Sequence, residues 1–243
     1  SRKRHVKLNM NLKKIKPQYL KKPNPRVGLI ALASDFMIEK DFSNVINGKK
    51  IDFFVNRIKC YNPLTSKNLI KMSKEVTNVT KEILPNQKID CVVYGCTSGT
   101  IAAGYRSIEK KIKKAKPNTK VTTPSTAAIK ALRKMKIKKI SVFTPYPKKL
   151  NNEVIDFLKK EKFIITSNSY FDIKSDINIG KVDPEYLFKV LSKMDHKNAD
   201  ALFVSCTALP VLEIIDKLEK KLNTIVLSSN QALIWDTLVK IKK

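Results

Sequence analysis

The sequence predicts an α/β fold in which parallel sheets are covered by helices on both faces. Short apolar runs, such as residues 27–33 and 201–205, alternate with longer segments of helical periodicity. The short runs are apolar throughout, which is typical of strands buried on both faces of a parallel sheet. An internal repeat also supports this class, because residues 90–97 (DCVVYGCT) resemble residues 200–207 (DALFVSCT) 110 positions later.

Each element is expected from its own pattern. Strands are predicted at residues 27–33, 51–58, 90–95, 121–123, 139–143, 163–169, 201–205 and 224–227. Helices are predicted where apolar residues follow a helical period, at residues 66–83, 99–115, 126–135, 150–161, 184–194, 210–222 and 231–241. Asp183 followed by Pro184 marks one helix start, because Asp caps helix N-termini and Pro is accepted in the first turn.

The repeat divides the chain into two similar lobes. Two further pairs of segments match in the same order, residues 27–34 with 140–146 and residues 121–128 with 225–232. We expect a basic arm at residues 1–25, lobe 1 at 26–120 completed by 224–243, and lobe 2 at 121–223. Ligands of open parallel sheets bind outside the carboxyl ends of the strands. A pseudo-twofold axis would bring the two sets of strand ends together, so we expect the active site in the cleft between the lobes.

Cys96 and Cys206 occupy matching positions in the repeat, each at the end of an apolar strand. We expect them to face each other, with thiol pKa values lowered by backbone N–H groups at helix N-termini. Neither His5, in the arm, nor His196, in a basic loop, suits a Cys-His dyad. One thiolate can remove a proton from a carbon acid while the opposite thiol delivers one, which is cofactor-free racemisation. Alternatively, a thiolate adds to a double bond and permits cis–trans isomerisation through a covalent adduct.

Hydroxyl residues follow both cysteines. Thr97, Ser98 and Thr207 suit a substrate carboxylate or a developing enolate through their hydroxyl and backbone N–H groups. Cys60 and Cys91 have no partner in the repeat and are interpreted as structural. Since the chain has no C-x-x-C pair, no metal site is predicted.

The chain is strongly basic, with 49 Lys and Arg against 21 Asp and Glu and a formal net charge of +28. Such a charge makes nucleic-acid binding an alternative function. However, only six of the basic residues are arginines, the lysines are spread along the chain, and no helix-turn-helix, finger or RNP pattern is present. For the arm at residues 1–25, a solvated tail and a nucleic-acid-binding segment both remain open. We therefore expect no specific nucleic-acid partner.

The compartment is predicted from the cysteines and the apolar runs. No run is long enough to span a bilayer, and no apolar segment follows the basic start as in a secretory signal. The four cysteines are interpreted as reduced thiols. We expect a cytoplasmic protein without a membrane partner.

Five motifs together resemble the Asp/Glu/hydantoin racemase superfamily. They are Gly95-Cys96-Thr97-Ser98, Thr123-Pro124-Ser125-Thr126-Ala127-Ala128, Thr144-Pro145-Tyr146, Ser205-Cys206-Thr207-Ala208-Leu209 and Ser228-Ser229-Asn230-Gln231-Ala232. The resemblance is to the branch that holds maleate cis–trans isomerase, arylmalonate decarboxylase and the ectoine-utilisation racemase-like protein. Residues 27–35 and 39–42 look most like the last of these. The resemblance implies two pseudo-symmetric flavodoxin-like lobes, a site in the cleft and no cofactor.

The resemblance also implies substrate-binding residues. Tyr146 matches a site tyrosine that donates to the substrate carboxylate or enediolate. Decarboxylases of the branch have glycine where this chain has Cys96, so a decarboxylase is disfavoured. Maleate isomerases have asparagine in the loop that here contains Ser34 and Asp35. An Asp at this place repels a dianion and suits a substrate amine. Asp after a strand is also a common helix cap, so this role stays open. Asn178 and Thr126 complete the candidate substrate contacts.

These observations predict an enzyme. We expect a cofactor-independent racemase or isomerase of a small amino-acid-like carboxylate, with Cys96 and Cys206 as acid and base; an ectoine-degradation intermediate is one candidate substrate. The first alternative is a maleate cis–trans isomerase with Cys96 as nucleophile. The alternative from another class is a basic protein that binds nucleic acid nonspecifically. We expect a homo-oligomer with no cofactor.

Overall fold

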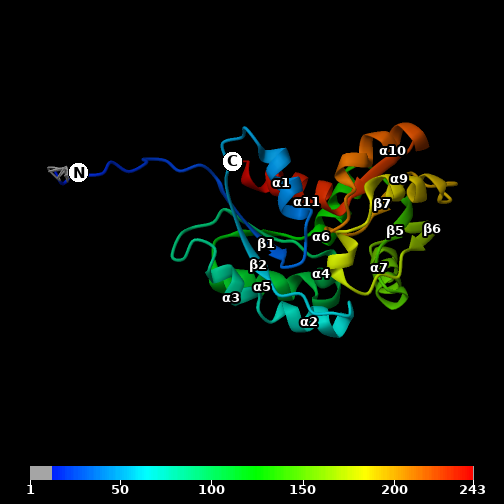
Figure 1. The fold of residues 1–243 in the computed structure, drawn as a ribbon, viewed down its shortest axis with the longest axis horizontal. Coiled ribbons are helices and arrows are strands. Elements are labelled where there is room, and N and C mark those ends of the chain that lie inside the picture. Colours follow the sequence, from blue (N-terminus) through cyan, green and yellow to red (C-terminus); the bar gives the residue numbers. More distant parts are fainter. Residues whose placement is uncertain (1–12, 243) are drawn as a thin grey trace, which may run out of the picture.

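The computed structural model describes residues 13–242 and contains two parallel four-stranded sheets with the same strand order (Figure 1). The first sheet contains, in spatial order, β2 (Asp52–Ile58), β1 (Arg26–Leu32), β3 (Cys91–Tyr94) and β4 (Lys120–Thr122). The second contains β6 (Ile164–Tyr170), β5 (Lys139–Thr144), β7 (Ala201–Val204) and β8 (Ile225–Ser228). All six strand pairings are parallel. The predicted α/β class with two equivalent lobes is confirmed.

Helices connect the strands and cover the sheets. In the first half they are α1 (Ile38–Ile46), α2 (Ser66–Ser73), α3 (Val76–Lys81), α4 (Thr97–Ala103), α5 (Tyr105–Ala115) and α6 (Pro124–Lys134). In the second half they are α7 (Lys148–Lys160), α8 (Asp176–Ile179), α9 (Pro184–Lys193), the 3-10 helix η1 (Leu212–Ile214), α10 (Ile215–Leu222) and α11 (Ser229–Ile241). The sequence did not predict α1 and α8. The single helix predicted at 99–115 is divided at Gly104, whose φ of +80° strains any other residue.

The internal repeat has a structural reason in each lobe. Asp90 accepts a hydrogen bond from the backbone N–H of Arg26 at 2.8 Å, and Asp200 accepts one from that of Lys139 at 2.8 Å. Each aspartate thus ties the segment before the third strand of its lobe to the start of the first strand. At the other end, the N–H groups of Gly95 and Ser205 each donate to the first strand of their own lobe at 2.9 Å. Cys96 and Cys206 therefore leave the two sheets in equivalent ways.

The core is continuous between the lobes on one side of the first sheet. Because successive side chains of a strand point to opposite faces, Val27, Leu29 and Ala31 of β1 pack with α1 and α11. Ile30 and Leu32 belong to the larger core, which also contains Phe143 and Phe203 of the second sheet. The two sheets are thereby held in one folded body.

The division between the lobes differs from the predicted one at two places. The expected boundary at 120/121 cuts β4, which pairs with β3 and belongs to the first sheet. The segment 224–243 serves both lobes, because β8 pairs with β7 while α11 packs against β3 and β4. Sheet membership is decided by strand pairing between distant segments, which the repeat alone did not specify.

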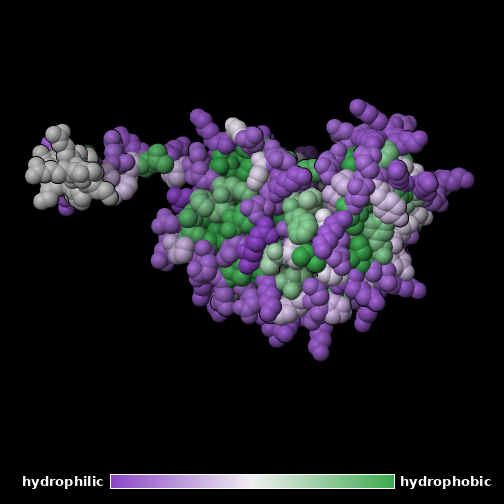
Figure 2. All heavy atoms as spheres, viewed as in Figure 1, coloured by the Kyte–Doolittle hydropathy of each residue, from purple (hydrophilic) through white to green (hydrophobic). Residues whose placement is uncertain are grey.

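The described part of the arm is exposed and basic. Residues 13–20 have no regular secondary structure and project away from the body (Figure 1). Residues 1–12 of the predicted arm lie outside the described residues. Figure 2 shows hydrophilic side chains over all parts of the visible face of the body, with smaller apolar areas between them. Within residues 13–242, no helix combines the length and the apolar character needed to cross a membrane.

Candidate active site

Cys96 lies between β3 and α4, at the N-cap of the helix. Its Sγ accepts a hydrogen bond from the N–H of Gly99 at 3.2 Å and lies 3.9 Å from the Ser98 hydroxyl. Gly99 makes room for the sulfur, since a Cβ at this position would lie 2.8 Å from Cys96 Sγ and 3.0 Å from the Tyr94 hydroxyl. The side chain is 4% exposed. The local chain therefore holds the thiol in a closely packed, buried position.

Cys206 lies after β7, in an irregular segment, and is also 4% exposed. Its Sγ accepts a hydrogen bond from the N–H of Ala208 at 3.4 Å. The next residue, Thr207, donates through its hydroxyl to the carbonyl of Gly95 at 3.2 Å. Since Gly95 precedes Cys96, this bond joins the two cysteine segments across the lobes. The Thr97 hydroxyl donates to that of Ser229, at the start of α11, at 3.0 Å.

Tyr146 completes the contact between the two segments. It follows β5, is 2% exposed, and lies beside Cys206, Cys96 and Ser98. Burial, followed by the neighbouring Cys206 and Cys96, raises the pKa of this phenol well above its usual value. Tyr146 is therefore a neutral donor that lies beside both cysteines.

The thiol pKa values differ from the sequence prediction. Burial raises the pKa of Cys96 well above its usual value, with further contributions from Cys60 and Asp176, and the Gly99 N–H and Ser98 oppose this only in part. Burial and Asp176 likewise raise the pKa of Cys206 against the Tyr146 hydroxyl and the Ala208 N–H. The expectation of lowered pKa values was wrong because loss of hydration outweighs one or two N–H groups. Both thiols are therefore neutral in this structure.

Two carboxyl groups lie beside the thiols. Asp35, in the β1–α1 loop, accepts hydrogen bonds through Oδ1 from the N–H groups of Met37 (2.7 Å) and Ile38 (3.0 Å). It therefore has the helix-capping role that the sequence left open. The adjacent Ser34 donates to Oδ2 of Asp176, at the start of α8, at 2.6 Å. Asp176 was not among the predicted site residues, although its charge raises the pKa of both cysteines.

Two predicted contacts lie elsewhere. Asn178 is exposed, and the buried residues of the same short helix are Asp176 and Ile179. Thr126 is only partly buried, and its hydroxyl lies 2.8 Å from that of Thr123 at the start of α6. Asn178 therefore stays a prediction, and one helical turn carries no periodicity from which an inward face can be read.

Two of the residues around Cys96 were not predicted. Cys60 was interpreted as structural, yet it lies close enough to Cys96 to contribute to the raised pKa of the Cys96 thiol. The hydroxyl of Tyr94 is buried beside Cys96 and has no hydrogen-bond partner among residues 13–242. Cys91, by contrast, packs in the smaller core under α1 and α11, as a structural residue would.

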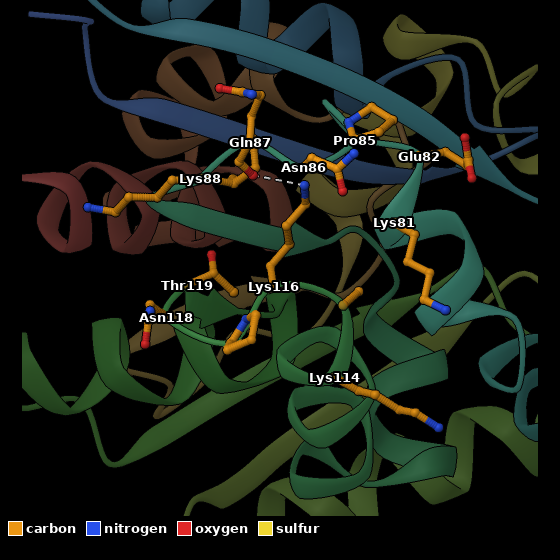
Figure 3. A pocket seen from close by; sticks show the side chains of 13 residues that line it. Lys81, Glu82, Pro85, Asn86, Gln87, Lys88, Lys114, Lys116, Asn118 and Thr119 are labelled. Carbon is orange, nitrogen blue, oxygen red and sulfur yellow. Dashed lines mark hydrogen bonds between the residues drawn. The ribbon is translucent and has the colours of Figure 1, made fainter.

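A cavity lined by several lysines lies at the opposite edge of the first sheet (Figure 3). It is formed by the segments that precede β3 and β4, whereas the cysteines follow the strands. The ammonium of Lys116 donates to the carbonyls of Leu84 (2.8 Å) and Gln87 (2.9 Å), the second of which is drawn in Figure 3. Lys116 thus holds the preceding loop in place, and this cavity is separate from the candidate site.

Comparison with known proteins gives maleate isomerases and an arylmalonate decarboxylase as relatives. The maleate isomerase of Geobacillus stearothermophilus is 25% identical over 228 residues, covering 88% of this chain and 90% of the relative. The crystal structure of the maleate isomerase Iso from Pseudomonas putida S16 matches with a TM-score of 0.82 and 22% identity, covering 88% of this chain and 92% of that one. A Nocardia farcinica maleate cis–trans isomerase, in a Cys-to-Ser mutant with a covalently bound succinylcysteine intermediate, matches with a TM-score of 0.82 and 18% identity over 89% and 92% of the two chains.

The family assignment rests on the sequence. Residues 68–243 match the family described as arylmalonate decarboxylase, which is most of the chain. The superfamily predicted from the motifs is thereby confirmed, while the particular similarity to ectoine-utilisation proteins stays a prediction. The chain is an enzyme and belongs to the arylmalonate decarboxylase family.

Proposed function

We propose that the protein is a cofactor-independent isomerase of a small carboxylate, with Cys96 and Cys206 as the reacting groups. One observation carries this proposal: the Thr207 hydroxyl joins the two cysteine segments at the carbonyl of Gly95, and the buried Tyr146 lies beside both cysteines. Two thiols from different lobes thus share one buried environment. Acid–base chemistry on two faces of a small molecule needs such an arrangement.

For the racemase reaction, one cysteine acts as thiolate and removes the proton from Cα. The opposite cysteine, as thiol, delivers its own proton to the other face of the carbanion. Tyr146 and Ser98 supply hydroxyl donors for the substrate carboxylate, whose negative charge increases as the enolate forms. Because both thiols are neutral in this structure, one of them must lose its proton before the reaction. An amino-acid-like substrate, with an ectoine-degradation intermediate as one candidate, is the form of this proposal that the sequence favours.

Maleate cis–trans isomerisation is the second candidate, and the maleate isomerase relatives favour it. Here the Cys96 thiolate adds to one alkene carbon, so that a C–S bond forms and the electron pair of the double bond moves into the adjacent carboxylate as an enediolate. Rotation about the former double bond and loss of the thiolate then give fumarate. The succinylcysteine of the Nocardia farcinica relative is the product of such an addition in that protein.

The test is proton exchange in heavy water, followed by NMR. The full chain is incubated with free and acetylated diaminobutyrate, aspartate, glutamate, a hydantoin and maleate. We expect deuterium at Cα of one amino acid, lost in both Cys96→Ser and Cys206→Ser and retained in the matched control Cys91→Ser, whose thiol is buried in the smaller core. Exchange that survives in Cys96→Ser would sink the two-thiol mechanism. Conversion of maleate to fumarate without amino-acid exchange would select the isomerase.

The remaining expectations stay predictions. Nonspecific nucleic-acid binding by the basic surface predicts affinity that falls steeply with salt. Sedimentation of the full chain tests the expected homo-oligomer, and fractionation of cells tests the cytoplasmic location.

A further inference from the structure

Asp35 and Asp176 form a pair of buried carboxyl groups from different lobes. They are 2% and 4% exposed, and Ser34, the neighbour of Asp35, donates to Asp176 at 2.6 Å. Asp35 contributes to the raised pKa of Asp176. We call Asp35 and Asp176 the carboxyl pair.

The carboxyl pair forms no salt bridge in the described part of the chain, although the charge of Arg57 partly offsets the raised pKa of Asp35. No salt bridge within residues 13–242 joins either side chain to a Lys or Arg, in a chain that contains 49 of them. Arg57 lies near Asp35, but its guanidinium donates to the backbone oxygens of Leu32 and Asp35 and to the carboxylate of Glu39. A buried carboxylate without a cation is costly, so this arrangement has a purpose other than stability.

One oxygen of the carboxyl pair is free to bind a ligand. Oδ1 of Asp35 accepts two backbone N–H groups, whereas Oδ2 has no hydrogen-bond partner among residues 13–242. The Thr207 hydroxyl lies beside Asp35 but is directed to the carbonyl of Gly95. The same environment contains the unpartnered hydroxyl of Tyr94, beside Cys96 and Cys60. Unpartnered polar atoms in a buried site are atoms that a substrate can satisfy.

The carboxyl pair acts on the reacting groups. Asp176 contributes to the raised pKa of both Cys96 and Cys206, and Asp35 contributes to that of Cys206. A cation bound at the carboxyl pair would cancel this negative field at both thiols. It would therefore favour the thiolate at the moment when substrate is present.

We propose that Asp35 and Asp176 bind a positively charged nitrogen of the substrate, so that the substrate is a zwitterionic amino compound rather than a dicarboxylate. This inference rests on the proposed function, because it uses the site of Cys96 and Cys206. It goes further by assigning Asp176, which no sequence motif indicated, to substrate selection. A maleate dianion would meet two carboxyl groups of its own sign here, and an ammonium group would meet two acceptors.

The test is calorimetric binding to the full chain, with diaminobutyrate as the ammonium probe and maleate as the dianion probe. We expect wild type to bind diaminobutyrate, and Asp35→Asn and Asp176→Asn each to weaken that binding at least about tenfold, the usual worth of a charge-assisted bond. Both variants should bind maleate as well as wild type or better. The matched control is Asp41→Asn, which neutralises a third buried carboxyl group that is already hydrogen-bonded to Asn230; it should leave diaminobutyrate binding unchanged.

Binding of maleate in preference to diaminobutyrate by wild type would overturn the inference, as would failure to bind diaminobutyrate at all. Unchanged diaminobutyrate binding in both Asp→Asn variants would overturn it as well. These outcomes are separate from failure of the proposed function, which is read from exchange in the Cys→Ser variants. Circular dichroism of each variant verifies that it is folded.

Discussion

The loops after β1 and β5 are equivalent in the two lobes, yet they carry opposite chemistry. Ser34 lies two residues after the end of β1 and is followed by Asp35. Tyr146 lies two residues after the end of β5. The first loop brings hydrogen-bond acceptors to the site, and the second brings a neutral phenol donor. The pseudo-symmetry of the backbone has therefore been kept while the side chains diverged. A site with an acceptor side and a donor side has a direction, and a substrate with a cation and a carboxylate fits it in one orientation.

The largest expected effect in this comparison is that of Tyr146→Phe. Removing the hydroxyl beside Cys206 and Ser98 leaves the developing enolate without a donor, and we expect turnover to fall about 100- to 1000-fold. The fall should occur with maleate and with amino-bearing substrates alike, because both present a carboxylate. Steady-state kinetics by NMR measures it. If the losses of turnover in Tyr146→Phe and in Asp176→Asn depended on the substrate to the same degree, the division into a donor loop and an acceptor loop would be contradicted.

A smaller loss is expected from Gly99→Ala, which sharpens the comparison between the two cysteine segments. The added methyl group would lie 2.8 Å from Cys96 Sγ, so the sulfur or the helix must shift. We expect activity to fall about 10- to 100-fold, as an overpacked contact costs about 1–3 kcal/mol. Ala102→Gly, on the same helix, is the control for a change of helix propensity. Activity in Gly99→Ala equal to that of wild type would mean that the position of Cys96 is not critical.

The carboxyl pair should lower stability at neutral pH. Burial raises the pKa of Asp176 from 3.8 to about 6, so the folded protein binds this proton more tightly than the unfolded chain. Stability contributed by the protonated form is therefore present below about pH 4 and is lost as the pH rises to about 6. We expect Asp176→Asn to raise the free energy of unfolding at pH 7 by about 1–2 kcal/mol. Urea denaturation at pH 4 and pH 7 checks this, and a gain of the same size at both pH values would speak against the mechanism.

The smallest effect concerns the strand ties at the far edges of the sheets. Asp200 accepts hydrogen bonds from two backbone N–H groups, which lower the pKa of its carboxyl group. Its contribution to the free energy of unfolding is therefore present at neutral pH and is lost as the pH falls through the pKa of the folded state. Because the side chain is exposed, we expect Asp200→Ala to cost only about 1 kcal/mol at pH 7. Asp156→Ala, on the exposed face of α7, is the control. The urea midpoint of Asp200→Ala should be lower than that of Asp156→Ala. Identical midpoints would mean that the hydrogen bonds of Asp200 do not stabilise the fold.

Much of the fold could be predicted because strands buried on both faces are recognisable from their composition. The runs that became β1, β3, β5 and β7 contain almost only apolar residues. The repeat then paired Cys96 with Cys206, and the structure links their segments through Thr207 and Gly95. Pattern and packing agree in these places, because burial of apolar surface decides both.

The parts that could not be predicted are those where polar residues are buried for other reasons. Asp41 and Asp176 lie in α1 and α8, the two helices that the sequence did not reveal. An acid in a short polar segment normally indicates exposure, so its burial is visible only once the second lobe is in place. Cys60 was misjudged for the same reason, since it comes near Cys96 through tertiary packing rather than through the repeat.

The position of α11 also has a consequence for synthesis of the protein. Leu233 and Ile234 of this helix pack under Val27 and Leu29 of β1, at opposite ends of the sequence. The first sheet is translated early, but one of its faces lacks the cover of α11 until that helix has left the ribosome. Nascent chains released before α11 should therefore be substrates for chaperones, and folding of the first lobe should be completed only after α11 has emerged.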